Sequence, residues 1–388
     1  AAVSWPLLTI TPSVGVMEWG RPLVVVHCLC FLFLDKPGIS VLTLISGAAN
    51  RFPDKVDKDP DAARKINVEA TRALASACAQ RSVFLIYIST DYVFPGKPGD
   101  APYEADAEPA PTNLYGLTKL DGEKAVLAEY EAAGKVGSAV VLRVPVLYGQ
   151  VSKDGGNAES AVNTLMDVVV NSAKEGAKKV KMDHWAVRYP TNTEDVARVC
   201  YGEFLLLIRL LAETTTNVLQ SGSPDIESGD KQSLPRILQF SSEDKYTKYE
   251  MCQLFAEIMG LPIDNIEANT EGNDPNATVQ RPYDCHLSTR ALQELGIDVS
   301  TQDFVGWWRK DAGRFDIRQG RRIASCSEDN RQPTFNIIEA FNTFHVWLGL
   351  ASIAERQSTW WDGESMLLSV EKFKLGAGAV LPHLVPPW

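Results

Sequence analysis

The stretch YGLTKLDGEKAV, residues 115–126, places a tyrosine and a lysine four positions apart at the start of a helical pattern that continues to about residue 133. Side chains at i and i+4 lie on one helix face, so Tyr115 and Lys119 can address the same ligand. In a reductase, the lysine ammonium lowers the pKa of the phenol, which then protonates a substrate carbonyl as hydride arrives. Such pairs also occur by chance on exposed helices, so an ordinary helix is the alternative interpretation.

The segment before this helix favours a site. VFLIYIS at 83–89 is β-branched and aromatic without polar alternation, which is typical of a strand buried on both faces of a parallel sheet. The strand ends in Ser89, Thr90 and Asp91, and ligands of open α/β sheets bind at the carboxyl ends of strands. Thr90 or Ser89 would donate a hydrogen bond to a substrate carbonyl. Alternatively, they only satisfy backbone groups where the strand ends.

The pattern around these segments predicts an α/β fold. Asp59 and Pro60 begin a helix that extends to about residue 80, and AVVLRV at 139–144 reads as a second buried strand. Strand, loop, helix and strand in this order predict a Rossmann-like doubly wound parallel sheet.

The second half has shorter elements and reads as a smaller α+β cap region. Thr247 and Glu250 form a capping box that opens a helix, and Gly260 ends it. The other predicted parts are helices at 158–172 and 193–201, a strand at 236–240, and loose surface loops at 213–235 and 265–280.

Composition limits the class of partner. The net charge of −11 and the isoelectric point near 5.1 argue against nucleic acid and anionic membranes, so we expect a small molecule or a protein as partner. Seven cysteines without a CxxC pair suggest neither a disulfide framework nor a metal site, and they favour the cytoplasm. The apolar run at 22–34 is about half the length of a membrane span and contains His27, so we do not expect a transmembrane helix there.

Longer strings carry a family resemblance. ISTDYVFPG (88–96), the Tyr115/Lys119 pair and LRVPVLYG (142–149) resemble the extended short-chain dehydrogenase/reductase family, in its dTDP-4-dehydrorhamnose reductase (RmlD-like) branch. Three further strings resemble the family of regulatory beta subunits of methionine adenosyltransferase, which belongs to that branch. They are MDHWAVRYPTNTEDVARVC at 182–200, KYTKYEMC at 245–252 and QRPYDCHLSTRALQELGI at 280–297. These strings are far more specific than the tyrosine and lysine spacing alone.

The resemblance implies a protein that binds NADP(H) and regulates the catalytic subunit that makes S-adenosylmethionine. It implies vestigial catalytic positions at Thr90, Asp91, Tyr115 and Lys119, with Thr90 and Asp91 beside the nicotinamide. The dinucleotide contacts that it implies are Cys28, Arg51, Tyr115, Lys119 and Leu147. Asn67, on the inner side of its helix, would contact a water or the backbone, or would be an ordinary surface asparagine.

The N-terminal part departs from the family pattern. The family's glycine-rich turn, GxxGxxG, holds the pyrophosphate at a helix N-terminus, and the chain has no such turn. LVVVHC at 23–28 looks like the family's fourth strand, yet its expected continuation AANRFPD begins only at Ala48. We therefore hypothesise that 29–47 is an insertion, such as a translated intron, and that the first three strands are lost or replaced. NADP binding should then be weak or absent.

The resulting division of the chain has four parts. They are an atypical segment at 1–47, a nucleotide-binding half at 48–150, a substrate or cap region at 151–314, and an unassigned extension at 315–388. Since the resemblance associates the family's C-terminal tail with the catalytic subunit, the extension bears on the partner interface.

Three functional hypotheses follow. The first is a regulatory subunit that binds methionine adenosyltransferase. The second is an NADPH-dependent sugar-nucleotide reductase, with Tyr115 as the acid, Lys119 as the ribose anchor and Thr90 as the carbonyl donor. The third is a chain that does neither, because missing strands leave an open sheet edge.

Overall fold

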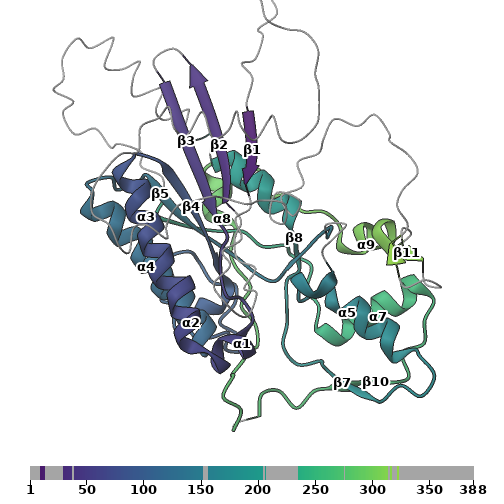
Figure 1. Ribbon diagram of the computed structural model, residues 1–388. Helices are drawn as coiled ribbons and strands as arrows, with labels where there is room; N and C mark the ends of the chain where they lie inside the picture. Colours follow the sequence, from purple (N-terminus) through teal and green to yellow (C-terminus); the bar gives the residue numbers. More distant parts are fainter. Residues whose placement is uncertain are drawn as a thin grey trace, which may run out of the picture. The chain divides into compact units, whose positions relative to one another are not determined.

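The computed structural model describes residues 9–13, 29–36, 39–151, 156–203, 206, 235–274, 276–312, 315–316 and 321–322. The first half of the chain forms a sheet with helices against it, and the second half contributes shorter helices and strands (Figure 1). This is the predicted α/β class. The division of the chain at residue 150 stays a prediction.

One sheet organises the first half, in the strand order β1-β2-β3-β4-β5-β9. The strands from β3 to β9 run parallel to their neighbours, whereas β1 and β2 form antiparallel pairs at one edge. The predicted strands at 83–89 and 139–144 are confirmed as β4 and β5. The bounds are Thr9–Ser13 (β1), Leu29–Lys36 (β2), Ile39–Ser46 (β3), Phe84–Thr90 (β4), Ala139–Val144 (β5) and Ile237–Gln239 (β9).

The expected family strand at 23–28, with Cys28, lies outside the described residues. The strand that leads into Ala48 is instead β3, which pairs in parallel with β4. Leu44 and Ile45 of β3 are buried in different apolar clusters, because neighbouring strand residues face opposite sides of a sheet. The structure therefore uses part of the segment 29–47 as sheet, and its origin as an insertion stays a prediction.

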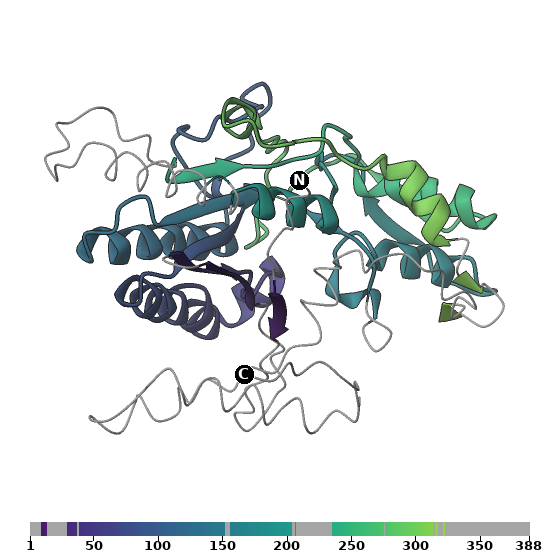
Figure 2. The ribbon, with the colours of Figure 1, turned by 90° about the horizontal axis from the view of Figure 1, so that it is seen from above.

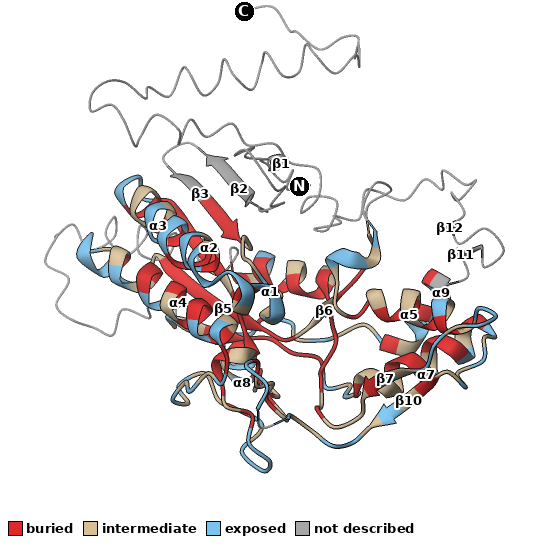
Figure 3. Ribbon diagram, turned by 60° about the horizontal axis from the view of Figure 1, so that its bottom comes forward, coloured by how far each residue is buried: buried red, intermediate tan, exposed pale blue. Residues whose placement is uncertain are grey.

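The two faces of the sheet bury different side chains. Leu85, Tyr87 and Val141 pack against α3 and α4, while Ile86 and Leu142 pack against the helix at 193–203. Figure 3 shows the central strands mostly buried: every residue of β5 is buried, and every residue of β4 except the half-buried Ile88. Burial on both faces explains why β4 and β5 are apolar without alternation.

Helices of the first half cover one face. The predicted helix 59–80 is divided into α2, a π-helical turn and α3, and the side chain of Asp59 caps it by accepting a hydrogen bond from the Ala62 amide, as expected. α3 and α4 lie side by side (Figure 2). The bounds are Pro53–Lys58 (α1), Pro60–Arg64 (α2), Lys65–Ala70 (π-helical turn), Thr71–Gln80 (α3) and Leu114–Ala132 (α4).

The second half contains its own apolar core, in which α5, α7 and α9 meet β7 and β10. The predicted capping box of Thr247 and Glu250 is confirmed, and Gly260 ends α7 at φ 63°. The prediction of a loop over 265–280 is wrong at its start, because 266–269 pairs with β7 in parallel. The bounds are Thr164–Ser172 (α5), Val180–Asp183 (β7), Lys248–Met259 (α7), Ile266–Asn269 (β10), Arg290–Glu294 (α8) and Phe304–Ala312 (α9).

Short elements complete the described structure. β6 and β8 form a parallel pair, and β11 and β12 an antiparallel pair. Their bounds are Leu147–Tyr148 (β6), Thr191–Asn192 (β8), Phe315–Asp316 (β11) and Arg321–Arg322 (β12). Residues 213–234 of the predicted loop at 213–235 and the rest of the extension 315–388 lie outside the described residues. Within the part of the chain that the structure describes, no helix has the length and apolarity that a membrane crossing requires.

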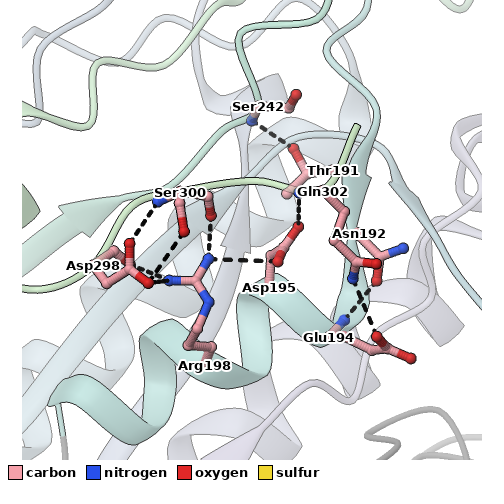
Figure 4. Close-up of polar contacts among 9 residues, drawn as sticks. All are labelled: Thr191, Asn192, Glu194, Asp195, Arg198, Ser242, Asp298, Ser300 and Gln302. Atoms are coloured by element: carbon pink, nitrogen blue, oxygen red, sulfur yellow. Dashed lines mark hydrogen bonds and ion pairs between the residues drawn. The ribbon is translucent and has the colours of Figure 1, made fainter. Parts of the chain in front are cut away.

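Hydrogen bonds and an ion pair hold the helix at 193–203 against the segment that precedes α9 (Figure 4). Asp195 accepts a hydrogen bond from the Gln302 amide at 2.9 Å, and Arg198 donates to the carbonyls of Asp298 and Ser300. Arg198 also pairs with the Asp298 carboxylate at 2.7 Å. These bonds satisfy the carbonyls of Asp298 and Ser300 and the amide of Gln302, in a segment outside the helices and strands.

Candidate functional site

The first turn of α4 lies beside the segment that follows β4. Asn113 caps the helix by accepting a hydrogen bond from the Gly116 amide at 3.0 Å. A Cβ atom at Gly116 would lie 2.1 Å from the Tyr92 carbonyl oxygen, so only glycine permits this approach. Tyr115 therefore comes to the carboxyl end of β4, edge-on to the Tyr92 ring at 5.9 Å between centroids.

Thr90, Asp91 and Tyr115 are brought together, as the sequence predicted. The Thr90 hydroxyl donates to Asp91 Oδ1 at 3.0 Å, accepts from the Tyr92 amide at 3.3 Å, and lies near the Tyr115 phenol. Asp91 is buried, and burial raises the pKa of its carboxyl to about 6, with the Arg188 guanidinium and Thr90 opposing the rise. The group thus contains a hydroxyl donor, a phenol and a carboxyl whose charge changes near neutral pH.

The acidity of the Tyr115 phenol differs from that expected in a reductase. Burial raises the pKa of the phenol above its ordinary value, and the hydrogen bond with Thr90 only partly opposes this rise. Lys119 does not lower it, because its ammonium is directed to β4 instead. The phenol is therefore a weaker acid in this structure than the spacing suggested.

Lys119 is buried within the fold, with 2% of its surface exposed. Its Nζ donates to the Tyr87 hydroxyl at 2.6 Å and to the Ile88 carbonyl at 2.8 Å, both on β4. Burial lowers the pKa of this ammonium to about 7, and the Glu123 carboxylate opposes the change. Lys119 is thus held against the strand and titrates near neutral pH.

A buried ion pair lies one helical turn further along α4. Glu123 accepts two hydrogen bonds from Arg143, at 3.0 and 2.8 Å, and one from the Ser89 hydroxyl at 2.5 Å. Both charged side chains are at most 2% exposed. This network was not predicted from the sequence. The signal was present, because Arg143 interrupts an otherwise apolar strand and Glu123 follows Lys119 by four residues.

The other predicted positions are only partly united with this group. Asn67 is buried and binds the backbone of Asn50 through both ends of its amide, which confirms the expected backbone contact. Arg51 is exposed and forms an ion pair with Glu159, 108 positions away. Leu147 is half-buried in β6, where the Ser160 hydroxyl donates to its carbonyl at 2.8 Å. The cofactor roles of Arg51 and Leu147 stay predictions.

Gly122 allows α4 to approach β4 closely enough for these contacts. A Cβ atom there would lie 2.4 Å from the Tyr87 hydroxyl oxygen and 2.6 Å from the Asn67 carbonyl oxygen. We expect Gly122→Ala to lower the free energy of unfolding by about 1–3 kcal/mol, because the helix must move away from the strand. Urea denaturation followed by circular dichroism measures this loss.

Gly156→Ala is the matched control. Gly156 has φ −84°, and the nearest atom to an added Cβ is 4.0 Å away, so its replacement should change stability by less than about 0.5 kcal/mol. Equal stability of the Gly122 variant and the wild type would show that α4 is not held at this distance by close packing.

Comparison with known proteins extends these observations. Residues 38–205 match the model of the RmlD substrate binding domain. The chain is 38% identical over 286 residues to proteins named methionine adenosyltransferase 2 subunit beta from Pongo abelii and Rattus norvegicus, covering 74% of this chain and 69% of each relative. It is also 39% identical over 153 residues to the dTDP-4-dehydrorhamnose reductase of Mycolicibacterium smegmatis, covering 39% of this chain and 42% of that protein.

Solved structures agree with the fold. A dTDP-4-dehydrorhamnose reductase from Clostridium acetobutylicum has a TM-score of 0.50 at 23% identity, covering 69% of this chain and 79% of the other. A dTDP-glucose 4,6-dehydratase from Streptomyces venezuelae, solved with NAD bound, has a TM-score of 0.50 at 16% identity, covering 70% and 74%. The likeness at these identities concerns the fold alone.

The sequence strings, the parallel sheet with its Tyr115 and Lys119, and the identity shared with relatives over most of their length agree with one another. The chain belongs to the family of methionine adenosyltransferase 2 beta subunits, in the RmlD-like branch of the extended short-chain dehydrogenase/reductases.

Proposed function

We propose that the chain is a non-catalytic regulatory subunit that binds the catalytic subunit of methionine adenosyltransferase and supports S-adenosylmethionine synthesis in the cytoplasm. The observation that carries this proposal is the identity of 38% over 286 residues with proteins named as the beta subunit of that enzyme. Cys78, Cys200, Cys252 and Cys285 are buried and form no disulfide among the described residues, which is in keeping with a reducing compartment.

The geometry around Tyr115 supports a non-catalytic role. A reductase requires a phenol acidified by a neighbouring ammonium, whereas burial raises the pKa of Tyr115 and Lys119 donates to β4. The vestigial interpretation of Thr90, Asp91, Tyr115 and Lys119 is consistent with this arrangement.

The described residues fit one end of NADP(H). An ammonium has three N–H donors, and Lys119 uses two of them on Tyr87 and Ile88. The third would donate to a ribose hydroxyl, and Tyr115 and Thr90 would lie at the nicotinamide end. The cofactor itself would supply the hydride. Arg51 already pairs with Glu159, and the sequence has no glycine-rich turn for the pyrophosphate, so we propose weak NADP(H) binding.

Complex formation tests the regulatory proposal. We expect the purified chain and the rat methionine adenosyltransferase 2 catalytic subunit to elute together from a size-exclusion column, with a mass by light scattering that exceeds that of either protein alone. Separate peaks from a well-folded chain would contradict the proposal, and an aggregated chain would support the hypothesis that it does neither.

Two variants separate partner binding from the vestigial site. Asp91→Asn and Tyr115→Phe change groups that lie at the end of β4 and the start of α4, and both replacements preserve side-chain shape. We expect both variants to form the complex with an affinity within about twofold of the wild type, because conservative changes away from an interface leave stability nearly unchanged. Loss of the complex in both would count against a regulatory surface outside this site.

A reductase is the second candidate, because the structure unites Thr90 with Tyr115 at the carboxyl end of a parallel strand. In that case NADPH absorbance at 340 nm falls steadily in the presence of dTDP-4-dehydrorhamnose, and Tyr115→Phe abolishes the decrease. A constant absorbance with the folded wild type would reject this candidate.

A further inference from the structure

The position of Lys119 depends on a residue that the family motif does not include. Tyr87 lies on β4 and is fully buried, with its ring in the apolar cluster between the sheet and α3 and α4. Its hydroxyl oxygen is the nearest acceptor of the Lys119 ammonium, at 2.6 Å, and the ammonium also lies 3.9 Å from the ring centroid. Both contacts favour the charged form of the lysine.

The Tyr87 hydroxyl is itself held in place. It accepts the Lys119 hydrogen bond and lies near Thr71 of α3, and Gly122 of α4 leaves room for it where a Cβ atom would lie 2.4 Å away. A rigid ring on a central strand therefore presents its oxygen at one fixed point. Ordering a lysine side chain costs rotamer entropy, so a fixed acceptor favours one rotamer over the others.

We propose that Tyr87 is a positioning residue: its hydroxyl fixes the Lys119 ammonium against β4, keeps it charged, and leaves one N–H directed to a ribose hydroxyl of a nicotinamide nucleotide. This proposal rests on the nucleotide binding proposed above. It concerns a residue outside the Tyr115/Lys119 pair.

The other charged and titratable groups around Lys119 do not replace Tyr87. Glu123, on α4, opposes the loss of the charge but makes its hydrogen bonds with Arg143 of β5 and Ser89 of β4. Tyr115, on α4, is neutral, because burial raises its pKa. Ile88 offers only a backbone carbonyl. Among the described residues, Tyr87 is therefore the side chain that gives the ammonium a direct acceptor.

Nuclear magnetic resonance of the chain with ¹³C- and ¹⁵N-labelled lysine tests the first half of the proposal. Lys119→Met assigns the Lys119 signal. We expect the titration midpoint of Lys119 in Tyr87→Phe to fall by about one pH unit, since a hydrogen bond to a charged group contributes about 1.5 kcal/mol. An unchanged midpoint in a folded variant would overturn the proposal.

Tyr130→Phe is the matched control for this measurement. Tyr130 is a buried tyrosine of the same helix α4, and its hydroxyl donates to the Val83 carbonyl at 2.6 Å, near the other end of β4. Its removal costs a comparable hydrogen bond and leaves the Lys119 midpoint where it is. A shift of the same size in both variants would assign the effect to general loosening of the fold.

Titration of NADPH fluorescence across the pH range tests the second half. The wild-type affinity should weaken about tenfold per pH unit above the Lys119 midpoint, because the ribose accepts from the charged form. In Tyr87→Phe, the pH at which the weakening begins should fall together with the midpoint seen by magnetic resonance. If the wild type binds NADPH and the affinity depends on pH in the same way in both proteins, the positioning role is refuted. If neither protein binds NADPH while the midpoint still shifts, the nucleotide proposal fails and Tyr87 has only an electrostatic role.

Discussion

Replacement of Glu123 by glutamine is expected to lower the free energy of unfolding by roughly 3–5 kcal/mol, which is the usual cost of removing one partner from a buried ion pair. Glu123 and Arg143 are 2% and 1% exposed, so the guanidinium left behind has no access to water. A neutral amide cannot accept both guanidinium hydrogen bonds and the Ser89 bond as strongly as a carboxylate does. Urea denaturation followed by intrinsic fluorescence measures the change.

An exposed ion pair of the same helix provides the control. Glu131 of α4 pairs with Arg236 at 3.2 Å, with 63% and 44% of their side chains exposed. Glu131→Gln should therefore change the free energy of unfolding by at most about 1 kcal/mol. The double variant Glu123→Gln/Arg143→Met removes the unpaired charge, and it should recover part of the stability lost by the single variant. Similar small losses in Glu123→Gln and Glu131→Gln would show that water reaches the Arg143 guanidinium.

The second large effect concerns Glu203, the last residue of the described helical stretch 193–203. Its side chain is 0% exposed, and neither carboxylate oxygen has a hydrogen-bond partner among the described residues. Burial raises the pKa of this carboxyl to about 8. The folded protein therefore holds a proton on Glu203 at pH values where the unfolded chain, with an ordinary pKa of 4.5, has released it.

The sign of the pH dependence follows from this difference. A carboxyl whose pKa is higher in the folded than in the unfolded state does not destabilise the fold below pH 4.5. As the pH rises from 4.5 to about 8, the free energy of unfolding falls. Glu203→Gln removes this loss. The variant should match the wild type near pH 4.5 and exceed it above pH 8, with an upper bound of roughly 5 kcal/mol.

Denaturation curves of both proteins across this pH range provide the test, because other titrating groups cancel in the difference. Glu194→Gln is the control on the same helix. Glu194 is only half-buried, and it accepts a hydrogen bond from Gln302 at 3.1 Å, so its variant tests whether loss of a carboxylate from this helix by itself changes the stability. A constant difference between Glu203→Gln and the wild type would show that the Glu203 carboxyl finds a partner or water in the folded chain.

The sequence by itself determined much of the local structure in both halves of the chain. The bounds of β5 and α4, the cap at Asp59 and the capping box of Thr247 and Glu250 follow from periodicity and from side chains within four positions. It also placed Thr90, Asp91 and Tyr115 at one site, because side chains at the carboxyl end of a buried parallel strand lie beside the first turn of the following helix. Family membership came from strings long enough to be specific, independent of any contact.

Only the tertiary structure decided where the charges of this site are directed. The spacing of Tyr115 and Lys119 fixes a shared helix face, yet the acceptor of the ammonium is Tyr87, 32 positions away. Arg51 likewise meets Glu159 across 108 positions, and the strand that joins β4 is 39–46 rather than 23–28. Such contacts depend on burial, on the close approach of α4 to β4 at Gly122, and on competition among acceptors. Helix and strand periodicity constrain near neighbours along the chain, so these choices become fixed only when the sheet and its helices pack.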